Sequence, residues 1–309
     1  MNVLYMKKII IGTRSSELAL WQANYIKKAL MAEYPETEVI LKHVKTKGDK
    51  ILDQALSKIG DKGLFTKELE NELLLGNIDI AVHSLKDMQT ELPDGLIIAA
   101  ITKRDNPEDS LISDIKGITI KDISKAATVA TGSLRRRAQL LHYRPDLNIV
   151  DLRGNVNTRL NKFHNSDWEA IILARAGLER INKEENIASV IPVNEMVPAV
   201  GQGALGVQIA GSNTELAEML KSVDHEKTRL EVTAEREFLK TLGGGCQTPI
   251  AAHARIENDI LHLDGLVSSL DGKNFIRDQI NSDPSKARET GRKLANDLLK
   301  KGADNILHL

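Results

Sequence analysis

The sequence predicts an α/β protein in which two similar βα domains face each other across a cleft and a small α+β domain follows. Three observations lead to this prediction. Short apolar segments alternate with amphipathic helical segments, a polar break divides the alternation into two series, and the C-terminal part orders its helices and strands differently. A chain of 309 residues is long enough for about two or three domains of ordinary size.

The first series of elements runs to residue 103. A strand is expected at 8–11, and a polar Gly-Thr-Arg-Ser-Ser turn joins it to a helix whose apolar residues lie three or four positions apart. Further elements are expected in the order strand 39–41, helix 67–75, strand 78–83 and strand 95–101.

The second series follows the polar residues 103–107, which suit a linker. Strands are expected at 128–131, 148–152 and 170–174, each followed by a helix. Because residues 197–210 cross back, we expect domain 1 to comprise residues 1–103 and 203–221, and domain 2 to comprise residues 108–198.

Domain 3 is expected at residues 223–309. It opens with a charged helix through Leu239, continues with short strands around 260–267, and closes with a helix at 285–301. Helices and strands that are segregated in this way are typical of an α+β domain.

Composition excludes several classes of protein. The single cysteine, Cys246, forms neither an internal disulfide nor a multi-cysteine metal site, so we expect a reducing, cytoplasmic environment and no metal. No segment approaches the roughly 20 consecutive apolar residues of a membrane span, so we expect no membrane anchor or signal peptide. A net charge of -1 and 3% aromatic residues argue against a nucleic-acid binder.

Arginine is dense between residues 131 and 160, where six arginines stand against two aspartates and no lysine. The planar guanidinium binds carboxylate or phosphate through two hydrogen bonds. Arg14, Arg135 and Arg153 each lie beside small residues at a strand-to-helix junction, where a helix N-terminus attracts anions. The set predicts an anion site at the carboxyl ends of the strands, although surface ion pairs are the alternative for any single arginine.

Asp87 ends the string His83-Ser84-Leu85-Lys86-Asp87, which lies just after the strand expected at 78–83. A carboxylate among basic residues is able to stabilise a cation or to move a proton. The alternative is a structural role, because Ser84 and Asp87 have the spacing of a helix cap. Pro93 and Gly95 weaken this alternative, since they leave room for a short helix at most.

Two glycine-rich segments have competing interpretations. Residues 201–206 match a dinucleotide-binding fingerprint, but a strand is expected to follow at 207–210 instead of a helix, so we interpret the segment as an interdomain crossover. Cys246 follows three glycines. A lone cysteine is usually a small buried side chain, whereas three glycines suit a mobile loop that presents the sulfur to a bulky group.

Several strings together make the sequence recognisable. It resembles the hydroxymethylbilane synthases, also called porphobilinogen deaminases, in GTRSS (12–16), GDKGLFTKELE (60–70), AVHSLKD (81–87), GSLRR (132–136), LRGNVNTR (152–159), VPAVGQGA (197–204) and GGCQ (244–247). The matches occur in order from residue 7 to about residue 255.

The resemblance implies a specific fold and reaction. Domains 1 and 2 are expected to be arranged like a periplasmic-type binding protein, with the active site in their cleft. A dipyrromethane cofactor is expected on Cys246 through a thioether. Four porphobilinogen units are added head to tail, each with loss of ammonia, and the linear tetrapyrrole is released by hydrolysis for tetrapyrrole and haem biosynthesis. The protein is expected to be a monomer.

The resemblance also assigns residue roles. Asp87 is expected to be catalytic, and Lys62 and Phe65 to lie on a mobile loop over the cleft. The carboxylates of cofactor and substrate are expected to be bound by Arg14, Ser16, Lys86, Arg135, Arg136, Arg153, Arg159 and Arg180, with further hydrogen bonds from Ser84, Thr131 and Ser133.

Two other functions remain open at this point. A two-domain anion-binding protein without catalysis would use the same cleft, but it would need neither Asp87 nor Cys246. A nucleic-acid binder would use Arg135, Arg136 and Arg137, although the sparse aromatic residues and balanced charge disfavour it.

Overall fold

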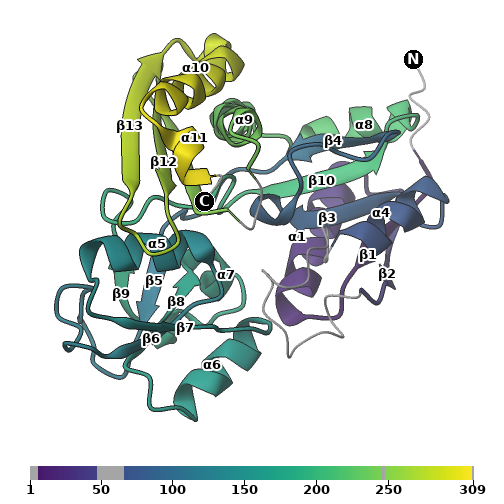
Figure 1. Ribbon diagram of the computed structural model, residues 1–309. Coiled ribbons are helices and arrows are strands. Elements are labelled where there is room, and N and C mark those ends of the chain that lie inside the picture. Colours follow the sequence, from purple (N-terminus) through teal and green to yellow (C-terminus); the bar gives the residue numbers. More distant parts are fainter. Residues whose placement is uncertain (1–5, 47–65, 245–247, 308–309) are drawn as a thin grey trace. The chain divides into compact units, whose positions relative to one another are not determined.

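The computed structural model describes residues 6–46, 66–244 and 248–307 (Figure 1). The described residues form two compact units. One unit holds residues 6–46, 66–104 and 204–229, and the other holds residues 105–203, 230–244 and 248–307. Among the described residues, none of the helices is both long and apolar enough to cross a membrane.

The first unit is a five-stranded sheet in the order β2-β1-β3-β10-β4. Its strands are β1 (Lys8–Thr13), β2 (Glu38–His43), β3 (Ile80–Ser84), β4 (Leu96–Ile101) and β10 (Leu205–Ala210). Strands β1, β2 and β3 are parallel, and β10 is antiparallel to both of its neighbours. Strand β10, which follows the second series of elements in the sequence, is therefore an inner strand of the first sheet.

Helices cover both faces of the first sheet (Figure 1). Helix α1 (Glu17–Glu33) buries Ile26 and Leu30 against Ile80 and Val82 on one face, where α8 (Thr214–Met219) and the 3-10 turn η3 (Leu220–Val223) also pack. Helix α4 (Lys67–Leu74) packs against Ala81 on the other face. Successive strand residues therefore point to opposite helices, as the period of a strand requires.

The second unit contains a sheet with the same plan, in the order β7-β6-β8-β5-β9. Its strands are β5 (Asp109–Ile112), β6 (Thr128–Ala130), β7 (Asn148–Val150), β8 (Ala170–Ala174) and β9 (Ile187–Ile191). Again three strands are parallel and the fourth, β5, is antiparallel to both neighbours.

Helices also cover both faces of this second sheet. Helix α5 (Leu134–Tyr143) packs on one face through Leu140. Helices α6 (Val156–His164) and α7 (Arg175–Glu179) pack on the other, and the 3-10 turn η2 (Glu184–Asn186) leads into β9. The alternation of strands and helices that the sequence predicts is confirmed in both units.

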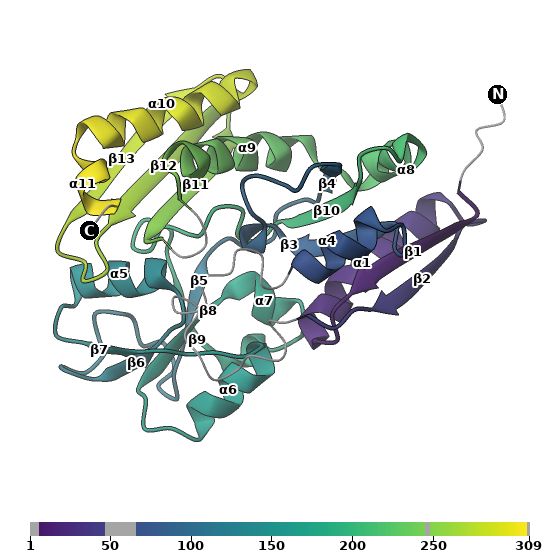
Figure 2. The same ribbon diagram turned by 45° about the vertical axis from the view of Figure 1, so that its right-hand side comes forward.

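The second unit also holds an antiparallel sheet of β11 (Ile250–Glu257), β12 (Ile260–Ser268) and β13 (Phe275–Ser282). Helices α9 (Glu226–Thr241), α10 (Ala287–Lys300) and α11 (Ala303–Leu307) lie on one face, and the 3-10 turn η4 (Pro284–Lys286) precedes α10 (Figure 2). On the other face, Phe275 stacks on His142 of α5, with ring centroids 3.8 Å apart. The predicted α+β character of this C-terminal region is confirmed.

Candidate active site

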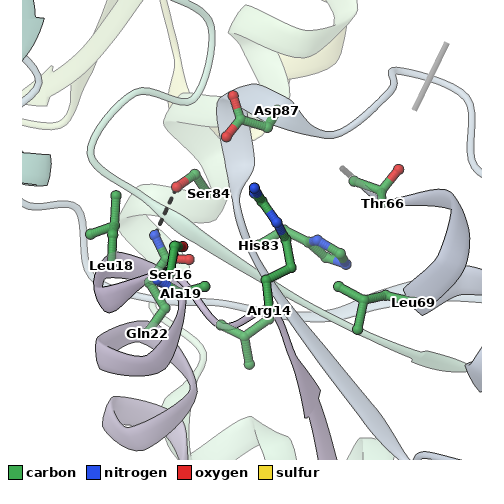
Figure 3. A pocket seen from close by; sticks show the side chains of 11 residues that line it. Arg14, Ser16, Leu18, Ala19, Gln22, Thr66, Leu69, His83, Ser84 and Asp87 are labelled. Carbon is green, nitrogen blue, oxygen red and sulfur yellow. Dashed lines mark hydrogen bonds between the residues drawn. The ribbon is translucent and has the colours of Figure 1, made fainter. Parts of the chain in front are cut away.

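A pocket opens at the carboxyl edge of the first sheet (Figure 3). Strands β1 and β3 are parallel neighbours, so the residues that follow them meet at this edge. The pocket is lined by Arg14, Ser16, Leu18, Ala19, Gln22, Thr66, Leu69, Val82, His83, Ser84 and Asp87. Four residues that the sequence predicts for the site, Arg14, Ser16, Ser84 and Asp87, are therefore brought together.

The Asp87 carboxylate lies at the mouth of this pocket. Asp87 ends the 3-10 turn η1 (Leu85–Asp87) and is exposed, and no described residue donates a hydrogen bond to its side chain. Figure 3 shows the guanidinium of Arg14 directed toward it. An ionised carboxylate is an acceptor only, so Asp87 is placed to meet a cation or an N–H group of a ligand.

Ser84 and Ser16 have different local roles. The Ser84 hydroxyl accepts a hydrogen bond of 2.8 Å from Gln22 Nε2 and makes no capping bond, so the helix-cap interpretation of Ser84 and Asp87 is wrong. Ser16 does cap its helix, because its Oγ accepts from the amide of Ala19 at 3.4 Å. Lys86, half-buried, lies in the same short turn as Asp87.

A buried polar network lies behind the pocket. His83 Nε2 is 3.1 Å from Gln208 Oε1, and Gln208 Nε2 donates to Glu70 Oε1 at 3.3 Å. Burial is the main cause that lowers the pKa of His83, to about 4, and burial also raises the pKa of Glu70. Sequence reasoning missed Gln208 and Glu70, because they join the network only when β10 enters the sheet beside β3.

The second sheet has its own cluster of predicted residues at the carboxyl ends of β6 and β7. Gly132 lies against the carbonyl of Leu152, where a Cβ would overlap with the oxygen. Ser133 Oγ accepts from the amide of Arg136 as the cap of α5. Thr131 Oγ1 in turn accepts from the amide of Ser133 at 3.3 Å.

Two arginines belong to this second cluster. Arg153 is half-buried, and its Nη1 is buried with no hydrogen-bond partner among the described residues. Arg159 Nε donates to the carbonyl of Gly154 at 2.7 Å. A buried guanidinium nitrogen without a partner is costly, so Arg153 is suited to bind an anionic ligand group.

Arg135 and Arg136 lie deeper. Both are buried, and each donates from Nη2 to a different oxygen of Asp109 at 2.8 Å. Burial by itself would raise the pKa of Asp109, but the two positive charges and their hydrogen bonds outweigh it, so its pKa lies well below the usual range. The cluster carries two positive charges against one negative charge. Their assignment to ligand carboxylates stays a prediction.

Arg180 forms hydrogen bonds with residues at both ends of the segment 105–203 of the second unit. Its Nε donates to Asp105 at 2.9 Å and its Nη2 donates to the carbonyl of Gly203 at 2.6 Å. The sequence did not indicate this pairing, because Asp105 and Gly203 are far apart along the chain. Cys246, Lys62 and Phe65 lie outside the described residues.

Comparison with known proteins decides the family. The family model "Porphobilinogen deaminase, dipyromethane cofactor binding domain" matches residues 9–218, and the model of the porphobilinogen deaminase C-terminal domain matches residues 229–300. The chain belongs to the porphobilinogen deaminase family. It is therefore a transferase of tetrapyrrole biosynthesis, as the resemblance of its motifs implied.

Individual relatives agree with this membership. The porphobilinogen deaminase of Chloroherpeton thalassium is 50% identical over 305 residues, which cover 97% of each chain. That of Moorella thermoacetica is 50% identical over 302 residues, which cover 98% of this chain and 96% of the relative.

Solved structures with distant sequences are also similar to the chain. The probable amino-acid ABC transporter extracellular-binding protein ytmK from Bacillus subtilis has a TM-score of 0.44 at 14% identity and covers 70% of this chain and 90% of its own. The methionine binding protein MetQ has a TM-score of 0.44 at 12% identity and covers 70% of this chain and 88% of its own.

The described residues fit the cofactor that the family model names. A dipyrromethane built from two porphobilinogen units carries acetate and propionate side chains and therefore needs several cationic partners. Arg153 has a buried nitrogen that makes no hydrogen bond to a described residue, and Arg14 lies in the pocket with Asp87. This donor set suits carboxylates, whose oxygens accept from guanidinium groups.

Proposed function

We propose that this porphobilinogen deaminase extends a dipyrromethane primer held on Cys246 through a thioether, with Asp87 as the catalytic residue. Porphobilinogen units are joined head to tail until the linear tetrapyrrole is released by hydrolysis. The observation that carries the proposal is the exposed Asp87 carboxylate, which stands in one pocket with Arg14. When bound, the primer would supply a nucleophilic pyrrole carbon, which attacks the electrophilic carbon of the first substrate unit.

The arginines hold the carboxylates of the ligands in this proposal. In the first unit, Arg14 and Lys86 provide positive charge, and Ser16 and Ser84 provide hydroxyl groups. In the second unit, Arg153 lies between β7 and α6, and Arg159 lies in α6 itself. The N-termini of the capped helices α5 and α6 also favour anions through the helix dipole. Thr131 and Ser133 add hydrogen bonds at the same edge.

Arg135, Arg136 and Arg180 are proposed to bind carboxylates of the cofactor or substrate as well. Asp109 neutralises only one of the two charges of Arg135 and Arg136. The remaining charge attracts an anion toward the carboxyl edge of the second sheet, since a buried charge is weakly screened.

Asp87 stabilises positive charge in the reaction. The bond between the aminomethyl carbon of porphobilinogen and its nitrogen breaks, and ammonia leaves. The cation that remains on the substrate is stabilised by the Asp87 carboxylate. The pyrrole carbon that forms the new carbon–carbon bond must then lose its proton, which Asp87 is placed to accept.

We further propose that the protein acts as a cytoplasmic monomer on porphobilinogen, without nucleic acid. The single cysteine supports a reducing environment. Membership of an enzyme family favours a catalytic function over the binding of anions without catalysis.

Intact mass and turnover test the proposal together. The purified protein should carry extra mass that reacts with a pyrrole reagent, and Cys246→Ser should lack this mass. Asp87→Asn should retain the mass but lose turnover by about a hundredfold or more. Asp94→Asn, which changes an exposed aspartate outside the pocket, is the matched control and should retain turnover. Full turnover of Asp87→Asn, or an unmodified Cys246 in active protein, would contradict the proposal.

A further inference from the structure

The network behind the pocket fixes the chemical state of His83. His83 is 5% exposed, Gln208 is fully buried and Glu70 is 4% exposed. The side chains lie in line, because His83 of β3 and Gln208 of β10 are on the face of the sheet that α4 covers, where Glu70 is located. The hydrogen bond between Gln208 and Glu70 fixes the orientation of the Gln208 amide, and that orientation fixes the hydrogen bond to His83.

Gln208 determines which ring nitrogen of His83 carries the proton. Its amide nitrogen donates to Glu70, so its amide oxygen faces His83 and must receive a hydrogen bond. His83 Nε2 is therefore the donor. Because burial keeps the imidazole neutral at physiological pH, the other nitrogen, Nδ1, carries a lone pair and acts as an acceptor.

This acceptor belongs to the wall of the pocket that holds Asp87. His83 lines the pocket, and Figure 3 shows its imidazole between Arg14 and Leu69. No described residue donates a hydrogen bond to Nδ1, and Nδ1 is not among the buried atoms that lack a partner. The pocket therefore offers a neutral acceptor in addition to the carboxylate of Asp87.

We propose that His83 Nδ1 accepts a hydrogen bond from the pyrrole N–H of a bound porphobilinogen unit. The proposal rests on the proposed function, which supplies the ligand. A pyrrole N–H is a neutral donor, whereas the ammonium group of the substrate would be repelled by nearby Arg14 and attracted to Asp87. A neutral acceptor also leaves Arg14 to the carboxylates of the ligand, because it does not form an ion pair with the guanidinium.

Two substitutions test the roles of the two ring nitrogens of His83 separately. In His83→Asn, the side-chain oxygen is able to occupy the position of Nδ1, but the bond to Gln208 is lost. In His83→Gln, the longer side chain reaches the position of Nε2 and retains the contact with Gln208, but nothing replaces Nδ1. A purely structural histidine would be replaced better by glutamine, and a ligand acceptor better by asparagine.

The expected result is a difference in KM for porphobilinogen. His83→Gln should raise KM about tenfold, as the loss of one hydrogen bond predicts, and His83→Asn should change it less. Intact mass and thermal unfolding of each variant verify cofactor content and folding. A KM of His83→Gln close to that of the natural protein, or a larger KM for His83→Asn, overturns the proposal. Failure of the natural protein to form tetrapyrrole would instead contradict the proposed function.

Nitrogen NMR of histidine-labelled holoenzyme gives a second test that does not depend on activity or on the folding of variants. At neutral pH, His83 should show a protonated Nε2 and an unprotonated Nδ1. Addition of porphobilinogen should shift the Nδ1 resonance in the direction of a hydrogen-bonded nitrogen. A proton on Nδ1 in the enzyme without substrate, or an unchanged Nδ1 resonance at saturating porphobilinogen, overturns the proposal.

Discussion

At the scale of single residues, burial gives His83 a charge state that differs between the folded and unfolded chain. The pKa of its imidazole is about 4 in the folded protein and about 6.5 in the unfolded chain. The unfolded chain therefore binds the extra proton between these values. A fall in pH through this range favours the unfolded state, because the imidazole is readily protonated in the unfolded chain and not in the folded protein.

The stability of the protein should depend on pH accordingly. The free energy of unfolding should fall as the pH drops from about 6.5 to about 4, and His83 should contribute up to about 3 kcal/mol of this loss. Urea unfolding at a series of pH values measures the effect. In His83→Gln, which has no titrating group at this position, the curve should be flatter by that amount. Parallel curves for the two proteins would show that burial does not suppress protonation of His83.

Sequence reasoning placed individual residues well but missed their partners. The sequence predicts positions at strand ends for Arg14, Ser84, Asp87 and Arg153, and the structure confirms these positions. They could be predicted because strand-to-helix turns have a local sequence pattern. The ion pairs of Arg135 and Arg136 with Asp109 could not be predicted. They require β5 to lie beside β8, and pairing between distant segments leaves no local signal.

At the scale of elements, helix α9 satisfies the edge of strand β11. Glu235 Oε1 accepts from the amide of Ala254 at 2.7 Å, and Glu231 Oε1 accepts from the amide of Ile256 at 3.0 Å. Four residues of helix advance about 6 Å and two residues of strand about 6.6 Å, so the two spacings match. Glu235 Oε2 also accepts from the amide of Gly201. These carboxylates cover donors that would otherwise be unpaired at a sheet edge.

Substitution of these two glutamates should therefore have unequal effects. Glu235→Gln places an amide N–H group against a backbone N–H group in a fully buried position, and should lower the free energy of unfolding by about 2 kcal/mol. Glu231→Gln retains one acceptor oxygen for the amide of Ile256 and should cost about 1 kcal/mol or less. Chemical denaturation at pH 7 compares the two variants. Equal losses would show that the second bond of Glu235, to Gly201, adds nothing.

The elements that the sequence predicted are the strongly patterned ones. The alternating residues of β3 and the strand β10 after the glycine-rich crossover are confirmed, and so are the helices that follow β1, β6, β7 and β8. Strands β5, β9, β11 and β13 were missed. Strand β5 is four residues long and begins with a buried aspartate, and β13 is polar along most of its length, so neither has a clear apolar alternation.

At the scale of the whole molecule, the two five-stranded sheets share one plan in which the fourth strand comes from a crossover. The α/β class could be predicted because alternation of strands and helices is local. The strand order could not, because β10 pairs with β3 across roughly a hundred residues of intervening chain. The activity followed from the resemblance of motifs, since composition and spacing indicated only an anion site.

Truncated chains should reveal the dependence of the first sheet on β10. A chain that ends at residue 203 lacks β10, which leaves β3 and β4 without their common neighbour. A chain that ends at residue 223 retains β10 and α8. Hydrogen exchange should show protected amides in β3 and β4 of the longer chain only, while β6 and β8 should be protected in both. Equal protection of β3 in the two chains would mean that three parallel strands suffice.

The position of β10 also determines the order in which the sheets can close on the ribosome. All five strands of the sheet that contains β5 have been synthesised by residue 191, whereas the sheet that begins with β1 lacks an inner strand until residues 205–210 emerge. Domains usually fold from the N-terminus as synthesis proceeds. In this protein the N-terminal sheet can be completed only after all strands of the other sheet have been synthesised. We therefore expect β3 and β4 to lack their common neighbour in the nascent chain until β10 emerges.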